Sequence, residues 1–566
     1  MLPHTEDVSI HGKPAAHRLR AVVPYLTLAS LVLPAHVGVA AIVGARGWDD
    51  GAITVAFART FGHTGIVSLT PFSESVEGFS SPFWLLLLAA TIKLLDLGFY
   101  GSLSASQLWS AAFATTACLL TYRLTAPRLG QVSAWLCSLA LFGAVPFLSE
   151  TMNGMEMSAL AVVALLIASM LRTRADGFSW LVFSLAFVGP FVRLEAAGYL
   201  VGGAIGLFGL SRSKKAATTI AAGAITSVAV MTLVRLSAFG YWLPNTMRAK
   251  QWPPYSGAFL ADRIGSSLSA LVEITYLLAP SCAFALGALL LSWRCLRRRA
   301  SDLVEVARSR VVPPVASYAL CYVGIVIAFN VAIGKTWGYA GRLELSAVGL
   351  VFILVTTVVW GHHRRVTVAT AALVICTIVV SCSAAIVGSS HGLEWTKLRT
   401  AVAGGEDWST VTPAGYRPTG IAADRVRVLL RKPSLAFMTP DVGGTSLCCT
   451  RLNIIDMAML ANTQLAKEGY RRFDWYLQKT SPDLIEVHGD WAQLSGIYRS
   501  RFFVESYSPI VVHDTWFYLR RDRLVELSYA CTAIPTRGTE SLRYRGGDPR
   551  DEGFVKSLAQ VRVCAL

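Results

Sequence analysis

The chain has 566 residues, of which 54% are hydrophobic and 15% are charged, and its net charge is +16. This composition excludes an ordinary soluble enzyme and predicts a polytopic membrane protein. Its basic residues lie between apolar segments, where they indicate membrane topology and contact with lipid headgroups, so we expect no nucleic-acid partner. Because zinc-type spacings and a glycine-rich nucleotide loop are absent from the sequence, we also expect no metal and no cofactor.

Apolar segments of membrane-spanning length fill the chain up to about residue 388. The first covers 21–45 and lacks a signal-peptide cleavage site, so we expect an uncleaved helix with its N-terminus in the cytoplasm. Further runs lie at about 83–97, 103–122, 131–149, 156–171, 179–193, 195–210, 216–234, 266–293, 312–333, 343–361 and 366–388.

Basic residues in the short connections orient these segments. The positive-inside rule places the connections at 123–128, 172–174, 212–215, 294–299 and 362–365 in the cytoplasm. The loop 45–82 and the tail then lie outside, but only if one segment between 83 and 122 does not cross. We favour a half-helix for the run that contains Lys93 and Asp96, which gives roughly eleven transmembrane helices.

The first outer loop carries an adjacent acid pair, Asp49 and Asp50, directly after the first apolar segment. Carboxylates at this depth are costly if they face lipid, so they are expected to line a polar cavity or the membrane interface. The spacing of Ala52, Val55 and Arg59 predicts a short helix along the membrane surface. The alternative is a solvated loop that happens to contain two acids.

The topology gathers other polar residues at the same outer surface. Arginine and lysine there would bind a phosphate, and a carboxylate would act as a general base toward a hydroxyl. The alternative for each single cation is a side chain that extends to the interface. Arg193 is the exception, because it follows Gly189 and Pro190 in a broken-helix pattern. The set comprises Glu77, Glu150, Glu156, Arg193, Glu195, Asn245, Arg248, Lys250, Lys335 and Arg342.

The tail, 389–566, is predicted to be a separate soluble α/β or α+β domain outside the membrane. Its strand-like runs are SLAFMT, LIEVH and FFVESY, and a helix is expected near Met457 to Leu477. Its cysteines could form a disulfide in an oxidising compartment, although the pairing stays open. They are Cys448, Cys449, Cys531 and Cys564.

Four motifs together resemble GT-C membrane glycosyltransferases, in particular the arabinofuranosyltransferases of actinobacterial cell walls. The first is WDDGAITVAFAR followed by SVEGFSSPFW, which resembles the family's first outer loop. The others are NGMEM, FVRLEA and FGYWLPNTMRAK, which resemble three further outer turns of that family.

The resemblance implies a GT-C-like catalytic domain at 1–388, with its first outer loop at 45–82, in the plasma (inner) membrane. The expected reaction moves a sugar, arabinofuranose, from a polyprenyl-phosphate donor to a hydroxyl of a cell-envelope glycan. Asp49 and Asp50 are the expected catalytic acids, and we favour Asp49 as the base. Binding of the donor phosphate is assigned to Arg193, Lys250, Arg248 and Arg342. Other substrate contacts are assigned to Arg59, Glu77, Glu156, Glu195 and Asn245.

Three alternatives stay open at this point. One is a non-catalytic glycan-binding scaffold, which would have no need for the acid pair. A mannosyltransferase that uses a polyprenyl-phosphate-mannose donor belongs to the same class of enzyme. A lipid or glycan transporter would also have many helices and buried charges. Transporters tend to show paired repeats and rarely carry a soluble outer domain after the last helix, and these two features favour the transferase.

Overall fold

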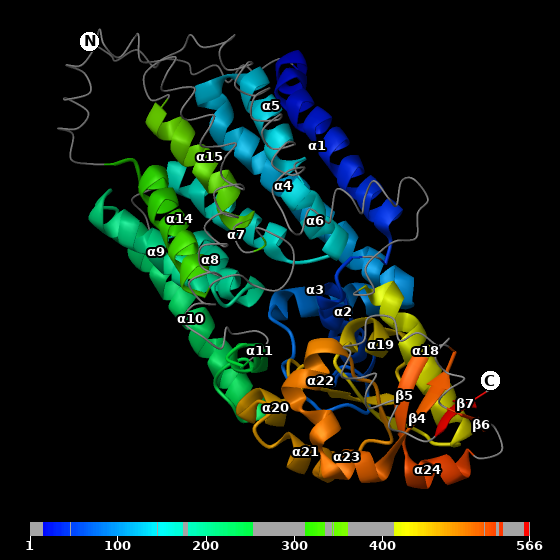
Figure 1. Cartoon of the computed structure of the whole chain (residues 1–566). Helices are drawn as coiled ribbons and strands as arrows, with labels where there is room; N and C mark the ends of the chain where they lie inside the picture. Colours follow the sequence, from blue (N-terminus) through cyan, green and yellow to red (C-terminus); the bar gives the residue numbers. More distant parts are fainter. Residues whose placement is uncertain are drawn as a thin grey trace, which may run out of the picture.

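The computed structural model of the chain has two parts, a bundle of helices and an α/β domain docked against one end of it (Figure 1). The apolar runs predicted at 266–293 and 366–388, and the domain boundary at 388, lie outside the described residues. The structure describes residues 15–45, 47–143, 145–173, 179–252, 312–333, 342, 345–359, 412–513, 515–527, 531–535 and 560–564.

The helices of the bundle follow the apolar runs of the sequence. Run 131–149 forms two helices, α5 and α6, with a bend of 50° between them. Within the described residues, α1, α10 and α14 are long and apolar enough to cross a membrane, and the bent pair would add a fourth span. The predicted total of roughly eleven spans stays a prediction. The bundle helices are α1 (Ala15–Val43), α4 (Phe99–Leu129), α5 (Gln131–Phe142), α6 (Val145–Asn153), α7 (Met157–Thr173), α8 (Trp180–Val192), α9 (Ala196–Gly209), α10 (Lys214–Phe239), α14 (Pro314–Ile333) and α15 (Leu345–Val359).

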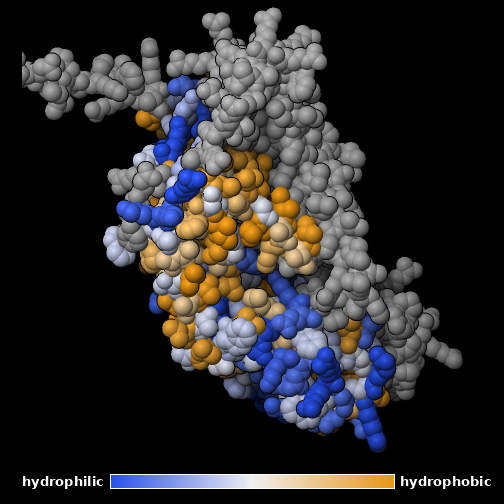
Figure 2. Space-filling model, turned by 90° about the vertical axis from the view of Figure 1, so that its left-hand side faces the viewer, coloured by the Kyte–Doolittle hydropathy of each residue, from blue (hydrophilic) through white to orange (hydrophobic). Residues whose placement is uncertain are grey.

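The outer face of the bundle is apolar. Leu26 on α1, Ile205 on α9 and Leu233 on α10 are each more than 60% exposed. Figure 2 shows a hydrophobic surface over the helical part and a more hydrophilic surface over the α/β domain. Exposed aliphatic side chains of this kind on long apolar helices are typical of a surface that faces lipid, and the chain is accordingly a membrane protein.

Two short helices, α2 (Asp49–Thr64) and α3 (Pro82–Leu95), lie between the bundle and the α/β domain (Figure 1). The helix predicted in the first outer loop is thereby confirmed, and it begins at the acid pair. Helix α3 has 14 residues, or about 21 Å, which is less than the hydrocarbon thickness of a bilayer. Ser81 caps its start by accepting a hydrogen bond from the Trp84 N–H, and Asp96 ends it with a φ of 48°. This length agrees with the predicted half-helix.

The α/β domain is built on a mixed sheet with the strand order β2-β1-β3-β5-β4-β7-β6. The pairs β1–β2, β1–β3 and β4–β7 are parallel, while β3–β5, β4–β5 and β6–β7 are antiparallel. The strands are β1 (Leu435–Thr439), β2 (Leu452–Asp456), β3 (Leu484–Ile485), β4 (Tyr507–Val512), β5 (Thr515–Arg520), β6 (Cys531–Pro535) and β7 (Gln560–Cys564).

Helices cover both faces of this sheet, because successive strand residues point to opposite sides. Phe437 and Leu484 pack into a core shared with α2 and α3, whereas Met438 and Ile485 pack into a second core on the other face. The first core runs without interruption from the bundle side into the domain. The domain helices are α18 (Pro413–Leu429), α19 (Val442–Cys448), α20 (Thr463–Glu468), α21 (Phe473–Thr480), α22 (Gly489–Ser495), η1 (Ile497–Arg499), α23 (Arg501–Ser506) and α24 (Arg521–Glu526).

Two segments of the domain differ from their prediction. The run FFVESY is mostly helix α23, because the Ser500 hydroxyl accepts a hydrogen bond from the Phe503 N–H and caps a helical turn, and β4 starts only at Tyr507. The helix expected near Met457 to Leu477 is divided into α20 and α21. Gly469 separates them with a φ of 60°, a backbone conformation that favours glycine.

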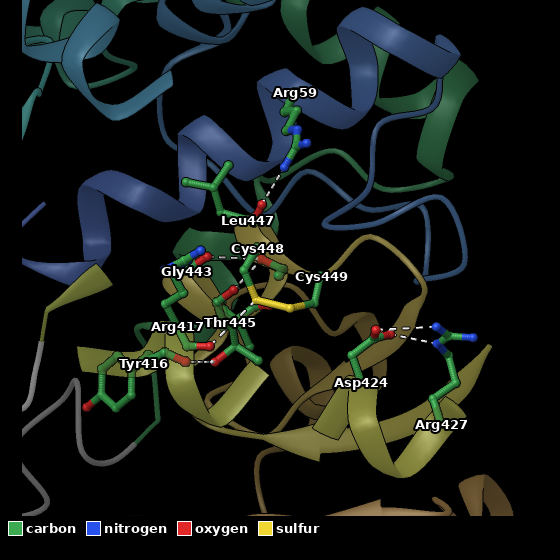
Figure 3. Close-up of a disulfide and its surroundings, with 12 residues drawn as sticks. Arg59, Tyr416, Arg417, Asp424, Arg427, Gly443, Thr445, Leu447, Cys448 and Cys449 are labelled. Atoms are coloured by element: carbon green, nitrogen blue, oxygen red, sulfur yellow. Dashed lines mark hydrogen bonds and ion pairs between the residues drawn. A yellow bond between two sulfur atoms is a disulfide. The ribbon is translucent and has the colours of Figure 1, made fainter. Parts of the chain in front are cut away.

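Helix α2 holds the domain through helix α19, and it contacts both ends of α19. The Asp49 carboxylate accepts hydrogen bonds from the Gly443 N–H at 2.8 Å and the Gly444 N–H at 2.7 Å. Arg59 donates to the Leu447 carbonyl at 2.6 Å, as Figure 3 shows. A carboxylate at a helix N-terminus and a cation at its C-terminus both interact favourably with the helix dipole. The docking is therefore electrostatic as well as apolar.

One disulfide within the described residues of the tail joins the adjacent residues Cys448 and Cys449, directly after Leu447 (Figure 3). The backbones of the other two tail cysteines, Cys531 and Cys564, are partners in the register of β6 and β7. A disulfide between neighbours closes a small ring at the end of α19 and does not link the domain to the bundle.

We expect Gly443→Ala to weaken the docking of the domain. An added Cβ would lie 2.5 Å from both the backbone oxygen and the Oδ2 of Asp49, and these atoms cannot retreat without breaking the hydrogen bonds to α19. Overpacking of this kind costs about 1 to 3 kcal/mol. Thermal unfolding in detergent measures the effect.

The control is Gly198→Ala in α9, where an added Cβ meets nothing within 4 Å. This variant should be as stable as the wild type or slightly more stable. Equal unfolding temperatures for Gly443→Ala and wild type would show that α19 does not need this close approach.

Candidate active site

The acid pair at the start of α2 is divided between two environments. Asp49 is only 7% exposed and is held by the backbone of α19. The side chain of Asp50 is 40% exposed and forms an ion pair with Arg342 Nη1 at 3.1 Å. Neighbouring side chains on a helix diverge by about 100°, so the two carboxylates cannot serve the same proton.

The geometry revises the preference for Asp49 as the base. Burial raises the pKa of Asp49 to about 7, although the N–H groups of Gly444 and Gly443 oppose this rise. A pKa near neutrality suits a general base, but position is the first requirement. Both Asp49 oxygens already accept hydrogen bonds inside the domain interface, whereas Asp50 is accessible. Asp50 is therefore the better candidate.

Asp50 lies beside two cations, Arg342 and Lys250, that have N–H groups without a hydrogen-bond partner among the described residues. Arg342 Nε is buried and makes no hydrogen bond. Lys250 is exposed and follows the short helix α11 (Asn245–Ala249). The charges of Asp50 and Arg342 both act on it. This arrangement can hold an anion next to an accessible carboxylate.

Arg193 lies at the C-terminal end of α8 and is surrounded by carboxylates. It forms ion pairs with Glu156 at 2.7 Å and Glu195 at 2.8 Å, and the Glu195 pair is bidentate. The guanidinium is only 3% exposed. Its charge is already compensated by these two glutamates, so among the predicted phosphate ligands Lys250 and Arg342 are better candidates than Arg193.

Glu150 adds a further buried carboxylate to this region. Its Oε1 accepts a hydrogen bond from the Met157 N–H at 2.5 Å, while its Oε2 makes none. The charges of Glu156 and Arg342 both act on it. The structure therefore brings seven of the acids and bases predicted at the outer surface into one mixed-charge cluster, while Lys335 lies outside the described residues. The seven are Asp50, Glu150, Glu156, Arg193, Glu195, Lys250 and Arg342.

Glu77 does not join this cluster. It forms a bidentate ion pair with Arg235 of α10, at 2.5 and 3.0 Å, and both side chains are buried. Its N–H also donates to the Tyr241 hydroxyl at 2.9 Å. Arg235 was missed in the sequence because it looks like a charge near the end of an apolar helix. The pair fixes the first outer loop to α10.

Three other residues with predicted roles also contact protein: Asn245 and Arg59, predicted as substrate contacts, and Arg248, predicted to bind the donor phosphate. The Asn245 amide donates to the Leu460 carbonyl at 2.8 Å and so connects α11 to the domain. Arg248 lies over the Tyr241 ring at 5.5 Å, and Arg59 is bound to α19. These positions support the architecture around the cluster.

Asn153 of the NGMEM turn positions the acid pair from the bundle side. Its Oδ1 accepts a hydrogen bond from the Trp48 N–H at 2.6 Å, just before α2 begins. An added Cβ at Gly51 would collide with the Asn153 carbonyl. Two of the motifs that resemble the same family therefore touch each other.

A second polar cluster was not predicted. Asp441, Glu486 and His488 lie together in the domain, and among the described residues they are the group that could hold a metal ion. The available signal was the Glu-X-His within the strand-like run LIEVH, since alternate residues of an extended segment share a face.

Comparisons with known proteins find similarity in structure only. No protein-family model and no curated protein matches the sequence. ArnT from Cupriavidus metallidurans in the apo state is 14% identical, with a TM-score of 0.50, over 89% of this chain and 98% of that one. ArnT bound to undecaprenyl phosphate gives 15% identity, a TM-score of 0.48 and coverages of 88% and 98%.

A third similar structure is the archaeal oligosaccharyltransferase AglB from Archaeoglobus fulgidus, in complex with an inhibitory peptide and a dolichol-phosphate. It is 10% identical, with a TM-score of 0.43, over 81% of this chain and 69% of that one. The likeness to apo ArnT shows that this chain has the GT-C-like fold of apolar helices followed by a sheet domain.

Proposed function

We propose that the chain is a glycosyltransferase that moves a sugar from a polyprenyl-phosphate donor to a hydroxyl of a cell-envelope glycan, at the outer face of the plasma (inner) membrane. The observation that carries the proposal is the accessible carboxylate of Asp50 beside Arg342 and Lys250. A base and two cations at one point suit a nucleophilic hydroxyl and an anionic leaving group. The shared fold with ArnT supports this class of enzyme.

In the proposed step, Asp50 accepts the proton of the acceptor hydroxyl while the hydroxyl oxygen attacks the anomeric carbon of the donor sugar. The new carbon–oxygen bond forms as the bond to the phosphate oxygen breaks. The electron pair leaves with polyprenyl phosphate. Lys250 and Arg342 stabilise the charge on this leaving group, so little acid assistance is required.

Asp49 has a positioning role in this proposal. Its carboxylate is fixed by two N–H groups of α19, so it sets the orientation of the first turn of α2. Asp50 is the next residue, and its direction follows from that of Asp49. The domain and the base are therefore connected through a single helical turn.

The donor sugar is proposed from the sequence motifs. They resemble arabinofuranosyltransferases, so arabinofuranose is the first sugar to test and mannose the second. The decisive experiment supplies the purified chain in nanodiscs with synthetic polyprenyl-phosphoryl-arabinofuranose or -mannose and an arabinan oligosaccharide. Mass spectrometry then detects an acceptor enlarged by one sugar. Movement of donor across a vesicle membrane without any product would support the transporter instead.

Replacement of the proposed base separates its role from that of its neighbour. We expect Asp50→Asn to lower kcat by at least ~10²-fold, with an unchanged unfolding temperature because the side chain is half exposed. Asp49→Asn should instead lower the unfolding temperature, because an amide presents only one acceptor oxygen to the two N–H groups of α19. A folded Asp49→Asn without turnover, together with a normal Asp50→Asn, would reverse the two roles.

Removal of the exposed cation tests the phosphate site. We expect Lys250→Ala to raise the KM for the lipid donor about tenfold or more, since a hydrogen bond to a charged group contributes roughly 1.5 to 3 kcal/mol. The KM for the acceptor should change little. The matched control is Lys215→Ala, which removes an exposed lysine from the start of α10, at the opposite end of that helix from Lys250. It should leave the donor KM unchanged. A donor KM unaffected by Lys250→Ala would place the phosphate elsewhere.

A further inference from the structure

The second polar cluster lies at the carboxyl ends of strands β1 and β3 of the α/β sheet. Strands β1 and β3 are parallel neighbours, while β2 pairs with the other side of β1. The chain therefore changes direction across the sheet between β1 and β3. In open α/β sheets, ligands bind outside the carboxyl ends of the strands at this type of switch point.

Three metal-ligating side chains follow these two strand ends. Asp441 comes two residues after β1, and Glu486 and His488 come directly after β3. One ligand atom from each lies within 4.8 Å of the others. Glu486 is held in place by the Thr439 hydroxyl, which donates to its Oε2 at 2.7 Å. The ends of β1 and β3 thus bring the side chains of Asp441, Glu486 and His488 together.

The distances within the cluster indicate two different interactions of the imidazole. His488 Nδ1 lies 2.7 Å from Glu486 Oε1, which is a normal hydrogen bond from an N–H to a carboxylate. In the neutral ring this leaves the lone pair on Nε2. A carboxylate that accepts from one ring nitrogen is the usual means of orienting a metal-binding histidine.

The other ring nitrogen faces a carboxylate across a wider gap. His488 Nε2 lies 3.4 Å from Asp441 Oδ2, beyond the usual range for an N–H···O hydrogen bond. Asp441 Oδ2 is buried and has no hydrogen-bond partner of its own, although the Tyr416 hydroxyl interacts with the same carboxyl group. Two ligand atoms bound to one ion at about 2.1 Å, in tetrahedral geometry, are about 3.4 Å apart. The gap fits an ion between them.

The local charge also favours a cation. Asp441 and Glu486 add two carboxylates at this edge, and Asp49 lies close enough for its charge to act on Asp441. The N-terminal end of α19, which could have held an anion, is already occupied by Asp49. A metal ion would compensate the excess of carboxylates.

We propose that Asp441 and His488 bind a divalent cation, with Glu486 orienting the imidazole. A site with one nitrogen and carboxylate oxygens suits Mn²⁺ or Zn²⁺ better than Mg²⁺ or Ca²⁺, which prefer oxygen ligands alone. The site departs from the absence of a metal expected from the sequence. It lies in the domain and does not depend on the proposed transferase reaction.

Direct binding of metal tests the proposal. The full chain, treated with EDTA and reconstituted in nanodiscs of uncharged phosphatidylcholine, is titrated with Mn²⁺ and followed by electron paramagnetic resonance. We expect one Mn²⁺ bound per chain and its displacement by Zn²⁺. Asp441→Asn and His488→Gln should each weaken binding at least ~100-fold, and Glu486→Gln about 10- to 100-fold.

The matched control is Glu505→Gln, which removes an exposed acid from the same domain and should leave Mn²⁺ binding unchanged. A second measurement on the wild type avoids any folding defect of the variants, because an imidazole ligand gives a ¹⁴N coupling in the spectrum of bound Mn²⁺. Wild-type protein that binds neither ion, or variants that bind like wild type, would overturn the site. So would bound Mn²⁺ without the ¹⁴N coupling.

If no metal ion binds, the cluster is explained by His488 as an imidazolium between the carboxylates of Asp441 and Glu486. Because the assay contains no sugar donor or acceptor, its outcome is separate from that of the transferase experiment. Failure of either proposal can therefore be recognised without the other.

Discussion

The structure depends on the way that α2 holds both ends of α19. A helix leaves unpaired N–H groups at its start and unpaired carbonyls at its end, and these must be satisfied when the helix is buried. Here a carboxylate from α2 binds the start and an arginine from α2 binds the end. Since α2 belongs to the first outer loop and α19 to the C-terminal domain, one pair of parallel helices joins the two parts of the chain. The continuous apolar core beneath them buries the two hydrogen bonds of Asp49, whereas the bond of Arg59 is partly buried.

This docking determines where the neighbouring carboxylate points. Asp49 is fixed inside the interface, so Asp50, one residue later on the same helix, must turn toward Arg342 and the exposed side. A change in the docking of the domain would rotate or shift the first turn of α2 and move Asp50 with it. The two acids thus have different tasks, since Asp49 holds the domain and Asp50 faces Arg342. Because they are consecutive on one helix, the direction of Asp50 depends on how Asp49 is held.

The sequence predicted much of this framework but little of its pairing. Apolar runs located the bundle helices, and the spacing of Ala52, Val55 and Arg59 predicted that a helix would follow the acid pair. The preference for Asp49 came from its position at the membrane edge, because its true partners, Gly443 and Gly444, are backbone groups nearly 400 residues away. The segment FFVESY was predicted as a strand from its aromatic and β-branched residues, yet the Ser500 cap makes it a helix. Local propensity cannot account for such tertiary partners.

The role of each charge in the membrane half also follows from its partners. A buried ion is stable only when it is paired, so the guanidinium of Arg193 between two glutamates, and that of Arg235 on Glu77, contribute to the scaffold. Arg342 and Lys250 retain capacity for a ligand, since one has an unbonded buried nitrogen and the other is exposed. In the domain, the helix start that commonly binds an anion is filled by the chain's own Asp49. The carboxyl end of β1, from which α19 starts, therefore lies next to the first outer loop, and Asp441 is close enough for the charge of Asp49 to act on it.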